Sequence, residues 1–243
     1  WMDRSCMNER LTLRNAMHQA VASALGTLDA VFPAKQDPPR EPSLATFQPS
    51  QRLSDALALA IAKHGGQARK GTTIPYVTHL LAVAALVGES GGAEDEMVAA
   101  LLHDAVEDGG GRPVLEEIRE RFGPVVAAIV EGCTDDVSGL THDKSPWLER
   151  KKAYLQRLAE APLSVLRVAC ADKLHNAQTI ARDLREFGPS VYQRFRGDRE
   201  GTLWYYRSLA RLFGALVQDC PDLDAGFRGL IRDLRETVAG LEV

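Results

Sequence analysis

Long hydrophobic runs are missing from this sequence, and so is the polar–apolar alternation of a half-buried strand. No apolar stretch among the 243 residues is long enough to cross a bilayer. No apolar segment of the kind found in signal peptides follows Trp1-Met2-Asp3-Arg4. We therefore expect a cytoplasmic protein without membrane contacts, and the missing alternation argues against a β-sheet.

Cysteine is scarce and positive charge is not in excess. Cys6, Cys133, Cys170 and Cys220 lie far apart, and no pair forms a C-x-x-C motif, so we expect reduced, structural thiols. The net charge of -4 argues against a general affinity for nucleic acid or an anionic membrane. A local basic pocket remains compatible with this charge.

Three parts are expected along the chain. Residues 1–32 carry apolar residues at helical intervals and predict an N-terminal helical extension. Residues 33–50 contain five of the twelve prolines, which cannot sustain a helix and indicate a linker. The remaining residues, 51–243, are expected to form the main domain.

Helical periodicity continues nearly throughout this main domain. Leu53, Ala56, Leu57, Ala60 and Ile61, for example, fall on one face of a helix. We therefore expect an all-α helical globule. Further helices are expected over residues 79–87, 94–107, from Pro113 onward, and over 125–132, 147–160, 163–185, 190–217 and 224–241.

The hexapeptide His103-Asp104-Ala105-Val106-Glu107-Asp108 follows a run that is apolar on all sides, as in a buried helix. In a continuous helix His103 and Glu107 share one face, and Asp104 and Asp108 share another about 100° away. Three carboxylates packed together would repel one another, and a divalent metal would remove that conflict. The hexapeptide alone fits a polar helix end equally well.

Two further polar residues stand beside apolar runs. His79 opens an apolar helix, where a lone histidine is more often a cap or a core residue than a ligand. Asp172 ends the run 166–171, and its apolar flanks argue against a purely solvated position. Together with His103-Asp104, these residues match the H…HD…D signature of HD-domain phosphohydrolases.

The surrounding segments resemble the hydrolase domain of the RelA/SpoT family, in the order found there. The similarity covers roughly residues 52–185. We expect no synthetase domain in the remaining length. The chain therefore resembles the stand-alone small alarmone hydrolases, such as the SpoT-like hydrolases of animals. Gly109-Gly110-Gly111 departs from the usual Thr-rich turn of the family, and the loop between Lys70 and His79 is one residue longer than in the long bifunctional enzymes. The matching segments are 64–79 (HGGQARKGTTIPYVTH), 100–108 (ALLHDAVED), 122–134 with its FG and GCT turns, and 171–179 (ADKLHNAQT).

The resemblance implies a metal site made of His79, His103, Asp104 and Asp172. Such a nitrogen and oxygen set suits Mn²⁺, Fe²⁺ or Zn²⁺, and the family likeness favours Mn²⁺. The resemblance also implies that Glu107 and Asp108 orient the attacking water or carry its proton. We therefore expect a metal-dependent (p)ppGpp 3′-pyrophosphohydrolase of the stringent response, which releases pyrophosphate and GDP or GTP.

Six residues are candidates for substrate binding. The resemblance implies that Arg69 and Lys70 contact guanine, and a guanidinium can stack on a purine. Asn176 and Thr179 lie on the helix face of Asp172 and could reach the ribose or phosphates. Arg150 and Lys151 are expected near the phosphates.

Alternative functions remain open from the sequence. They are an HD phosphohydrolase of other nucleotides or NADPH, and a non-catalytic nucleotide-binding module. The partner that we expect is a small guanine nucleotide, without nucleic acid or membrane, and a homo-oligomer is left open.

Overall fold

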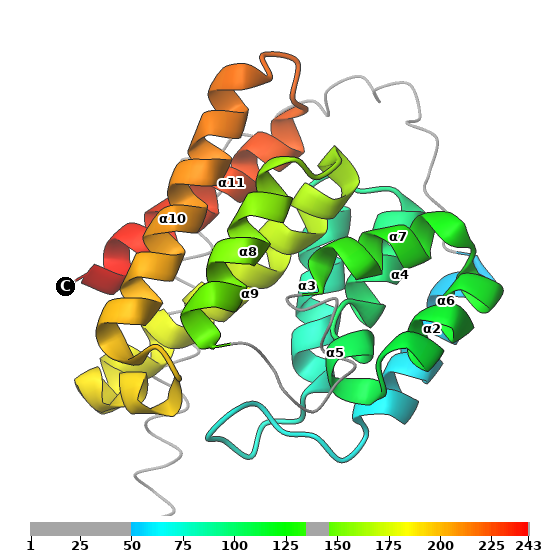
Figure 1. Ribbon diagram of the computed structural model, residues 1–243, viewed down its shortest axis with the longest axis horizontal. Helices are drawn as coiled ribbons and strands as arrows, with labels where there is room; N and C mark the ends of the chain where they lie inside the picture. Colours follow the sequence, from blue (N-terminus) through cyan, green and yellow to red (C-terminus); the bar gives the residue numbers. More distant parts are fainter. Residues whose placement is uncertain (1–49, 135–145, 243) are drawn as a thin grey trace, which may run out of the picture. The chain divides into compact units, whose positions relative to one another are not determined.

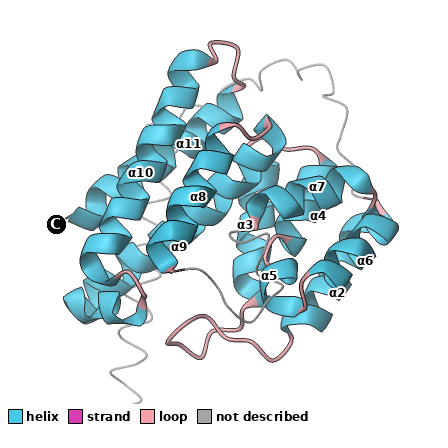
Figure 2. Cartoon of the chain, in the orientation of Figure 1, coloured by secondary structure: helices cyan, strands magenta, loops and turns pink. Residues whose placement is uncertain are grey.

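The computed structural model describes residues 50–134 and 146–242, and these are almost entirely helical (Figure 1). Within these two stretches there is no strand, only an isolated antiparallel bridge between Ala68 and Pro75 (Figure 2). The all-α prediction is therefore confirmed for the described part of the chain. The helices are α2 Gln51–His64, α3 Val77–Glu89, α4 Glu94–Leu102, α5 Ala105–Gly109, α6 Arg112–Phe122, α7 Pro124–Cys133, α8 Trp147–Ala159, α9 Leu163–Phe187, η1 Gly188–Arg194, α10 Asp198–Asp219, α11 Ala225–Ala239 and η2 Gly240–Glu242.

The predicted extension over residues 1–32 and nearly all of the predicted linker at 33–50 lie outside the described residues. The domain division therefore stays a prediction. Among the helices that the structure describes, none combines the length and apolar character needed to span a bilayer.

Helix α9 is the central element of the core. It packs against α3, α4, α7 and α11, and most residues of its first half are buried. In Figure 1, α8, α10 and α11 lie on one side of α9, whereas α4 to α7 lie on the other. Polar side chains of α9 therefore lie between two groups of helices, and Asp172 is one of the buried ones.

Helix α4 explains how polar groups reach the interior. Its residues from Val98 to Leu102 are all buried, so the chain continues directly from the core into His103. The acidic residues of its first turn, Glu94, Asp95 and Glu96, suit the positive end of the helix dipole. The sequence expectation of a buried helix leading into the polar hexapeptide is thus met.

The prediction of one helix over 94–107 is wrong. Helix α4 ends at Leu102, and His103 and Asp104 form a turn before α5. The ring Nδ1 of His103 donates to the carbonyl of Ala100 at 2.8 Å, the carbonyl that an unbroken helix would pair with the Asp104 amide. The amide of Asp108 still donates to the Asp104 carbonyl at 3.0 Å, so these two acids remain one turn apart.

The single helix predicted over 190–217 is also wrong, because η1 and α10 replace it. Gly188 has a φ of 69° and ends α9, and Asp198 has a φ of 49° at the start of α10. Between them, Gly197 packs so closely on the Trp147 ring that a Cβ would lie 2.6 Å from it. The spacing of apolar residues does not predict these two residues with positive φ, at which the helical path is interrupted.

Candidate metal centre and nucleotide cavity

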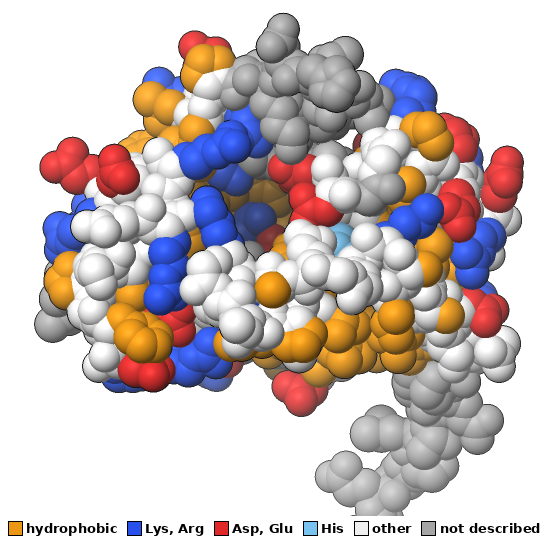
Figure 3. Space-filling view, turned by 90° about the horizontal axis from the view of Figure 1, so that it is seen from below, with side chains coloured by type: hydrophobic (Ala, Val, Ile, Leu, Met, Phe, Trp, Pro, Cys, Tyr) orange, Lys and Arg blue, Asp and Glu red, His pale blue; other side chains and the backbone are white. Residues whose placement is uncertain are grey.

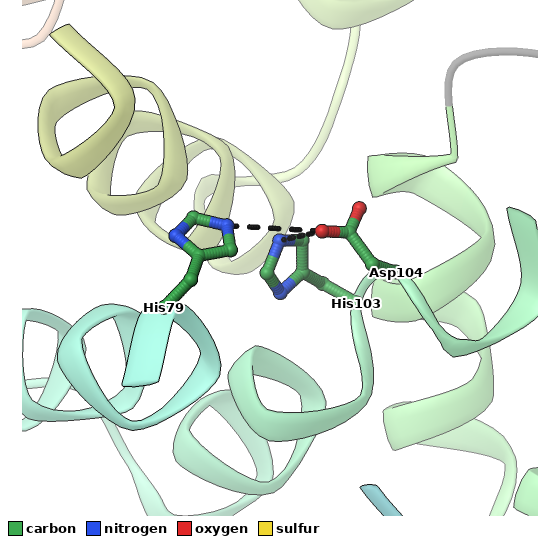
Figure 4. A group of neighbouring side chains, drawn as sticks. All are labelled: His79, His103 and Asp104. Carbon is green, nitrogen blue, oxygen red and sulfur yellow. Dashed lines mark ion pairs between the residues drawn. The ribbon is translucent and has the colours of Figure 1, made fainter. Parts of the chain in front are cut away.

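Three elements bring two histidines and two aspartates together. His79 comes from the first turn of α3, His103 and Asp104 from the turn before α5, and Asp172 from the middle of α9. Nε2 of His79 lies 3.2 Å from Oδ1 of Asp172, and Nε2 of His103 lies 3.0 Å from Oδ2 of Asp104. The crossed distances are 3.7 Å from His79 to Asp104 and 3.6 Å from His103 to Asp172. Figure 4 shows His79, His103 and Asp104 pointing toward one another. The possible ligand atoms of these three residues all lie within 4.8 Å of one another.

The two imidazoles present free ring nitrogens to this cluster. His103 uses its Nδ1 proton on the Ala100 carbonyl, so its Nε2 carries a lone pair in the neutral ring. Nε2 of His79 and Nε2 of His103 are both buried and have no hydrogen-bond partner among the described residues. Buried polar atoms are nearly always satisfied, so two orphaned nitrogens facing two carboxylates fit a bound cation.

The electrostatics of the cluster favour positive charge. Burial alone would lower the pKa of His103, but the Asp104 carboxylate outweighs it and raises that pKa well above its usual value. Burial would likewise raise the pKa of Asp172, yet Lys173 and the two histidines hold it well below its usual range. The pKa of His79 is lowered by burial. Two ionised carboxylates in a buried site therefore attract a proton, and a divalent cation would neutralise the same negative charge.

Neighbouring side chains orient both carboxylates. The hydroxyl of Tyr76 donates to Oδ2 of Asp104 at 2.5 Å. Asp172 accepts from Lys173 at Oδ2 and from the Asn176 amide at Oδ1, each at 2.5 Å. Arg69 in turn donates to Oδ1 of Asn176 at 2.6 Å, which links the loop before α3 to the centre.

Glu107 and Asp108 lie on the short helix α5, beyond the metal-centre turn. Glu107 is half-buried and Asp108 is exposed. Oδ2 of Asp108 accepts from Nε2 of Gln67 at 2.8 Å, and Oε1 of Gln67 accepts from Nδ1 of His64 at 2.7 Å. A chain of two hydrogen bonds therefore positions Asp108 from the end of α2.

A cavity of about 590 Å³ adjoins the metal centre. Figure 3 shows a hollow on this face, with Lys and Arg side chains gathered along its rim. Among its described lining residues, seven are cationic and Asp183 is the one carboxylate. The seven are Arg69, Lys70, Lys151, Lys173, Arg182, Arg194 and Arg196.

Most of the predicted substrate-binding residues line this cavity. Arg69, Lys70, Asn176, Thr179 and Lys151 are all among its walls. The hydroxyl of Thr179 also donates to the carbonyl of His175 at 3.0 Å, within the helix.

Arg150 is the remaining predicted substrate-binding residue, and its role stays a prediction. It is only 8% exposed and is not among the described lining residues of the cavity, although its neighbour Lys151 is. The two residues are adjacent on α8 and therefore point in directions about 100° apart. The side chain of Arg150 is directed into the protein.

Several residues of the site have no role assigned from sequence alone. His175 lies 2.8 Å from His79, between the two Nδ1 atoms, and burial lowers its pKa to about 4. Tyr76 and Lys173 were not singled out either, although both lie within motifs that were recognised. Arg194 and Arg196 lie in the segment for which the sequence predicts a single helix over 190–217. The spacing of apolar residues does not indicate that these two arginines face a cavity.

The family model described as "HD domain" matches residues 56–203, more than half of the chain. The chain belongs to the HD-domain family. This HD domain is 33% identical over 188 residues to the guanosine-3′,5′-bis(diphosphate) 3′-pyrophosphohydrolase of Drosophila melanogaster, an alignment that covers 76% of the chain and 97% of that enzyme. It is 37% identical over 147 residues to the enzyme of the same name from Xenopus tropicalis, covering 59% of the chain and 75% of that enzyme.

Longer relatives and a solved structure share the same domain. The chain is 38% identical over 133 residues to the pyrophosphohydrolase of Aquifex aeolicus, covering 55% of the chain but only 18% of that protein. A solved structure of a metazoan ortholog of SpoT, which hydrolyses ppGpp and plays a role in starvation responses, superposes with a TM-score of 0.60 at 25% identity. That superposition covers 79% of this chain and 97% of the ortholog chain.

Proposed function

We propose that this HD domain is a (p)ppGpp 3′-pyrophosphohydrolase that releases pyrophosphate and GDP or GTP, and so acts in the stringent response. The observation that carries this proposal is a cation-lined cavity beside a cluster of two histidines and two aspartates. A polyanionic nucleotide matches the charge of the cavity. The relatives from Drosophila and Xenopus bear the name of this activity.

His79, His103, Asp104 and Asp172 are the residues that would hold a divalent cation, which we propose to be Mn²⁺. When bound, such a cation supplies Lewis-acid stabilisation of phosphoryl charge and a water that is nucleophilic near neutral pH. Support comes from the two orphaned Nε2 atoms and from the carboxylates that face them. The ion that occupies the site in the cell stays a prediction.

Residues of the chain account for substrate binding and proton handling. Lys151 places positive charge in the cavity for the phosphates. Arg69 and Lys70 line the same cavity for the guanine, and Arg69 stands over the Tyr76 ring at 5.5 Å, where a purine could also stack. We assign to Glu107 and Asp108 the orientation of the attacking water and the transfer of its proton. Asp108 is held for this task by Gln67.

We further propose that the enzyme works in the cytoplasm. Cys133, Cys170 and Cys220 are free thiols in the described part of the chain, in keeping with a reducing compartment. The expectations of no nucleic-acid partner and of a possible homo-oligomer remain predictions.

The decisive test is an assay of ppGpp hydrolysis by the full chain with Mn²⁺, with pyrophosphate as the readout and EDTA as the control. Release of pyrophosphate that stops with EDTA is expected. A panel of dNTPs and NADPH should be turned over more slowly than ppGpp. Binding of ppGpp without pyrophosphate release would reject the proposal in favour of a binding module.

A further inference from the structure

His175 contacts His79 of the metal centre at the ring nitrogen that faces away from Asp172. Its Nδ1 lies 2.8 Å from Nδ1 of His79, and the two ring centroids are 4.9 Å apart. The other ring nitrogen of His79, Nε2, is the one that faces Asp172. His79 is therefore held between a carboxylate on one side and a second imidazole on the other.

A hydrogen bond between two ring nitrogens contains one proton, so one ring donates and the other accepts. If Nε2 of His79 is to bind a cation, its lone pair must be free, and the proton of the ring must be on Nδ1. His175 must then accept at its own Nδ1 and carry its proton on Nε2. The opposite arrangement would place the His79 proton on Nε2, where it blocks the cation.

The second histidine of the centre provides a comparison within the same site. Nδ1 of His103 donates to the carbonyl of Ala100, and a carbonyl can only accept. The tautomer of His103 is thus fixed by the backbone, whereas that of His79 depends on a side chain. That side chain lies one helical turn after Asp172 on α9 and also lines the cavity.

We infer that His175 is a positioning residue that accepts the Nδ1 proton of His79 and so keeps Nε2 of His79 available to the cation. This inference rests on the proposed metal site. Partners of this kind orient a ligand and raise its basicity, and their loss typically weakens metal binding by about 10- to 100-fold.

The test compares the Mn²⁺ affinity of the full chain with that of His175→Phe and His175→Asn, measured by titration of free Mn²⁺ with electron paramagnetic resonance. Phenylalanine keeps the ring shape without an acceptor, whereas the Asn side-chain oxygen can take the place of Nδ1. We expect binding about 10- to 100-fold weaker in His175→Phe and recovery to within a few-fold in His175→Asn. The visible spectrum of the Co²⁺-loaded protein should change in the first variant and return in the second.

Gln178→Phe, at an exposed position of the same helix, serves as the matched control and should bind Mn²⁺ normally. His175→Leu replaces His175→Phe if the latter does not give a wild-type circular dichroism spectrum. Unchanged affinity in the acceptor-free variant, or equal loss in His175→Phe and His175→Asn, would overturn the inference while leaving the proposed function intact. Failure of the wild-type chain to bind Mn²⁺ or Co²⁺ would overturn the proposed function, and the role of His175 with it.

Discussion

The hydroxyl of Tyr76 donates to Oδ2 of Asp104 across 2.5 Å, and the same oxygen lies 3.0 Å from Nε2 of His103. Burial and the Asp104 charge raise the pKa of Tyr76, so the phenol keeps its proton throughout the physiological range. The phenol is therefore the donor in this hydrogen bond, and it fixes the direction in which the carboxylate presents its metal-facing oxygen.

Removing this hydroxyl should weaken the metal centre without disturbing the fold. Tyr76→Phe keeps the ring that stacks on His64 and loses one charge-assisted hydrogen bond. We expect the Kd for Mn²⁺ to rise about tenfold, which corresponds to about 1.4 kcal/mol. Titration of Mn²⁺ measures this. Tyr192→Phe is the control, because its hydroxyl donates to the distant Leu241 carbonyl, and equal affinities in wild type and Tyr76→Phe would contradict the assignment.

Metal binding should also stabilise the folded chain. Mn²⁺ at about 100 times its Kd is expected to raise the free energy of unfolding by about 2.7 kcal/mol, because only the folded state assembles the four ligands. Urea unfolding with and without Mn²⁺ measures the increment. Asp172→Asn should lose most of it, whereas Asp233→Asn on α11 should keep it. An undiminished increment in Asp172→Asn would remove this residue from the ligand set.

The two acids of α5 should be separable from the metal ligands by kinetics. Glu107→Gln and Asp108→Asn are each expected to lower kcat by about 10²- to 10⁴-fold, the usual worth of a general acid or base. The Mn²⁺ affinity of both variants should stay at the wild-type value. Normal turnover with metal bound would refute the catalytic assignment for the residue concerned.

Two adjacent lysines of α8 offer a paired test of the cavity. Lys151 lines the cavity, whereas Lys152 is exposed and is not among its described walls. Lys151→Ala should raise KM for ppGpp about tenfold or more, because a hydrogen bond to a charged group is worth about 1.5–3 kcal/mol. An unchanged kcat would show that the contact is equally strong in substrate and transition state. Lys152→Ala should leave KM unchanged, and a similar KM in both variants would place the phosphates elsewhere.

The start of α11 gives a pH-dependent contribution to stability. Asp224 caps this helix by accepting from the Phe227 amide at 2.8 Å, and Arg167 donates to its carboxylate at 2.7 Å. The hydrogen bond from Arg167 lowers the pKa of Asp224, so the stabilisation is present at neutral pH and is lost as the pH falls through this lowered value. Asp224→Ala should cost about 1 kcal/mol at pH 7 in urea unfolding.

The same measurement in acid checks the sign of this effect. Wild type and Asp224→Ala should converge in stability only once the pH lies below the lowered pKa of Asp224. A difference that grows on acidification would contradict the ionised cap. Asp222→Ala, two residues earlier and outside the helix, should match wild type at both pH values.

Much of this architecture could be predicted from the sequence, because helical periodicity and family-like motifs are local signals. The apolar run before His103 predicts a buried helix. The resemblance to the H…HD…D signature implies that His79, His103, Asp104 and Asp172 meet. Their role in binding a metal stays a prediction. The break at His103 could not be foreseen, because it depends on a side-chain bond to the Ala100 carbonyl.

What the sequence could not predict involves partners far apart in the chain. His175 and His79 are separated by 96 residues, and their hydrogen bond exists only after α3 packs on α9. A second feature that periodicity does not show is that Arg150 is buried whereas its neighbour Lys151 lines the cavity. Adjacent residues on a helix point in directions about 100° apart.

Helix α9 carries Asp172 of the candidate metal centre and, one to two turns later, Asn176 and Thr179 of the cation-lined cavity. A turn of helix advances by about 5.4 Å, so the single helix α9 sets the spacing between the proposed site of hydrolysis and the proposed nucleotide-binding residues. We therefore expect substitutions toward the carboxyl end of α9 to change which nucleotide is accepted without changing the position of Asp172.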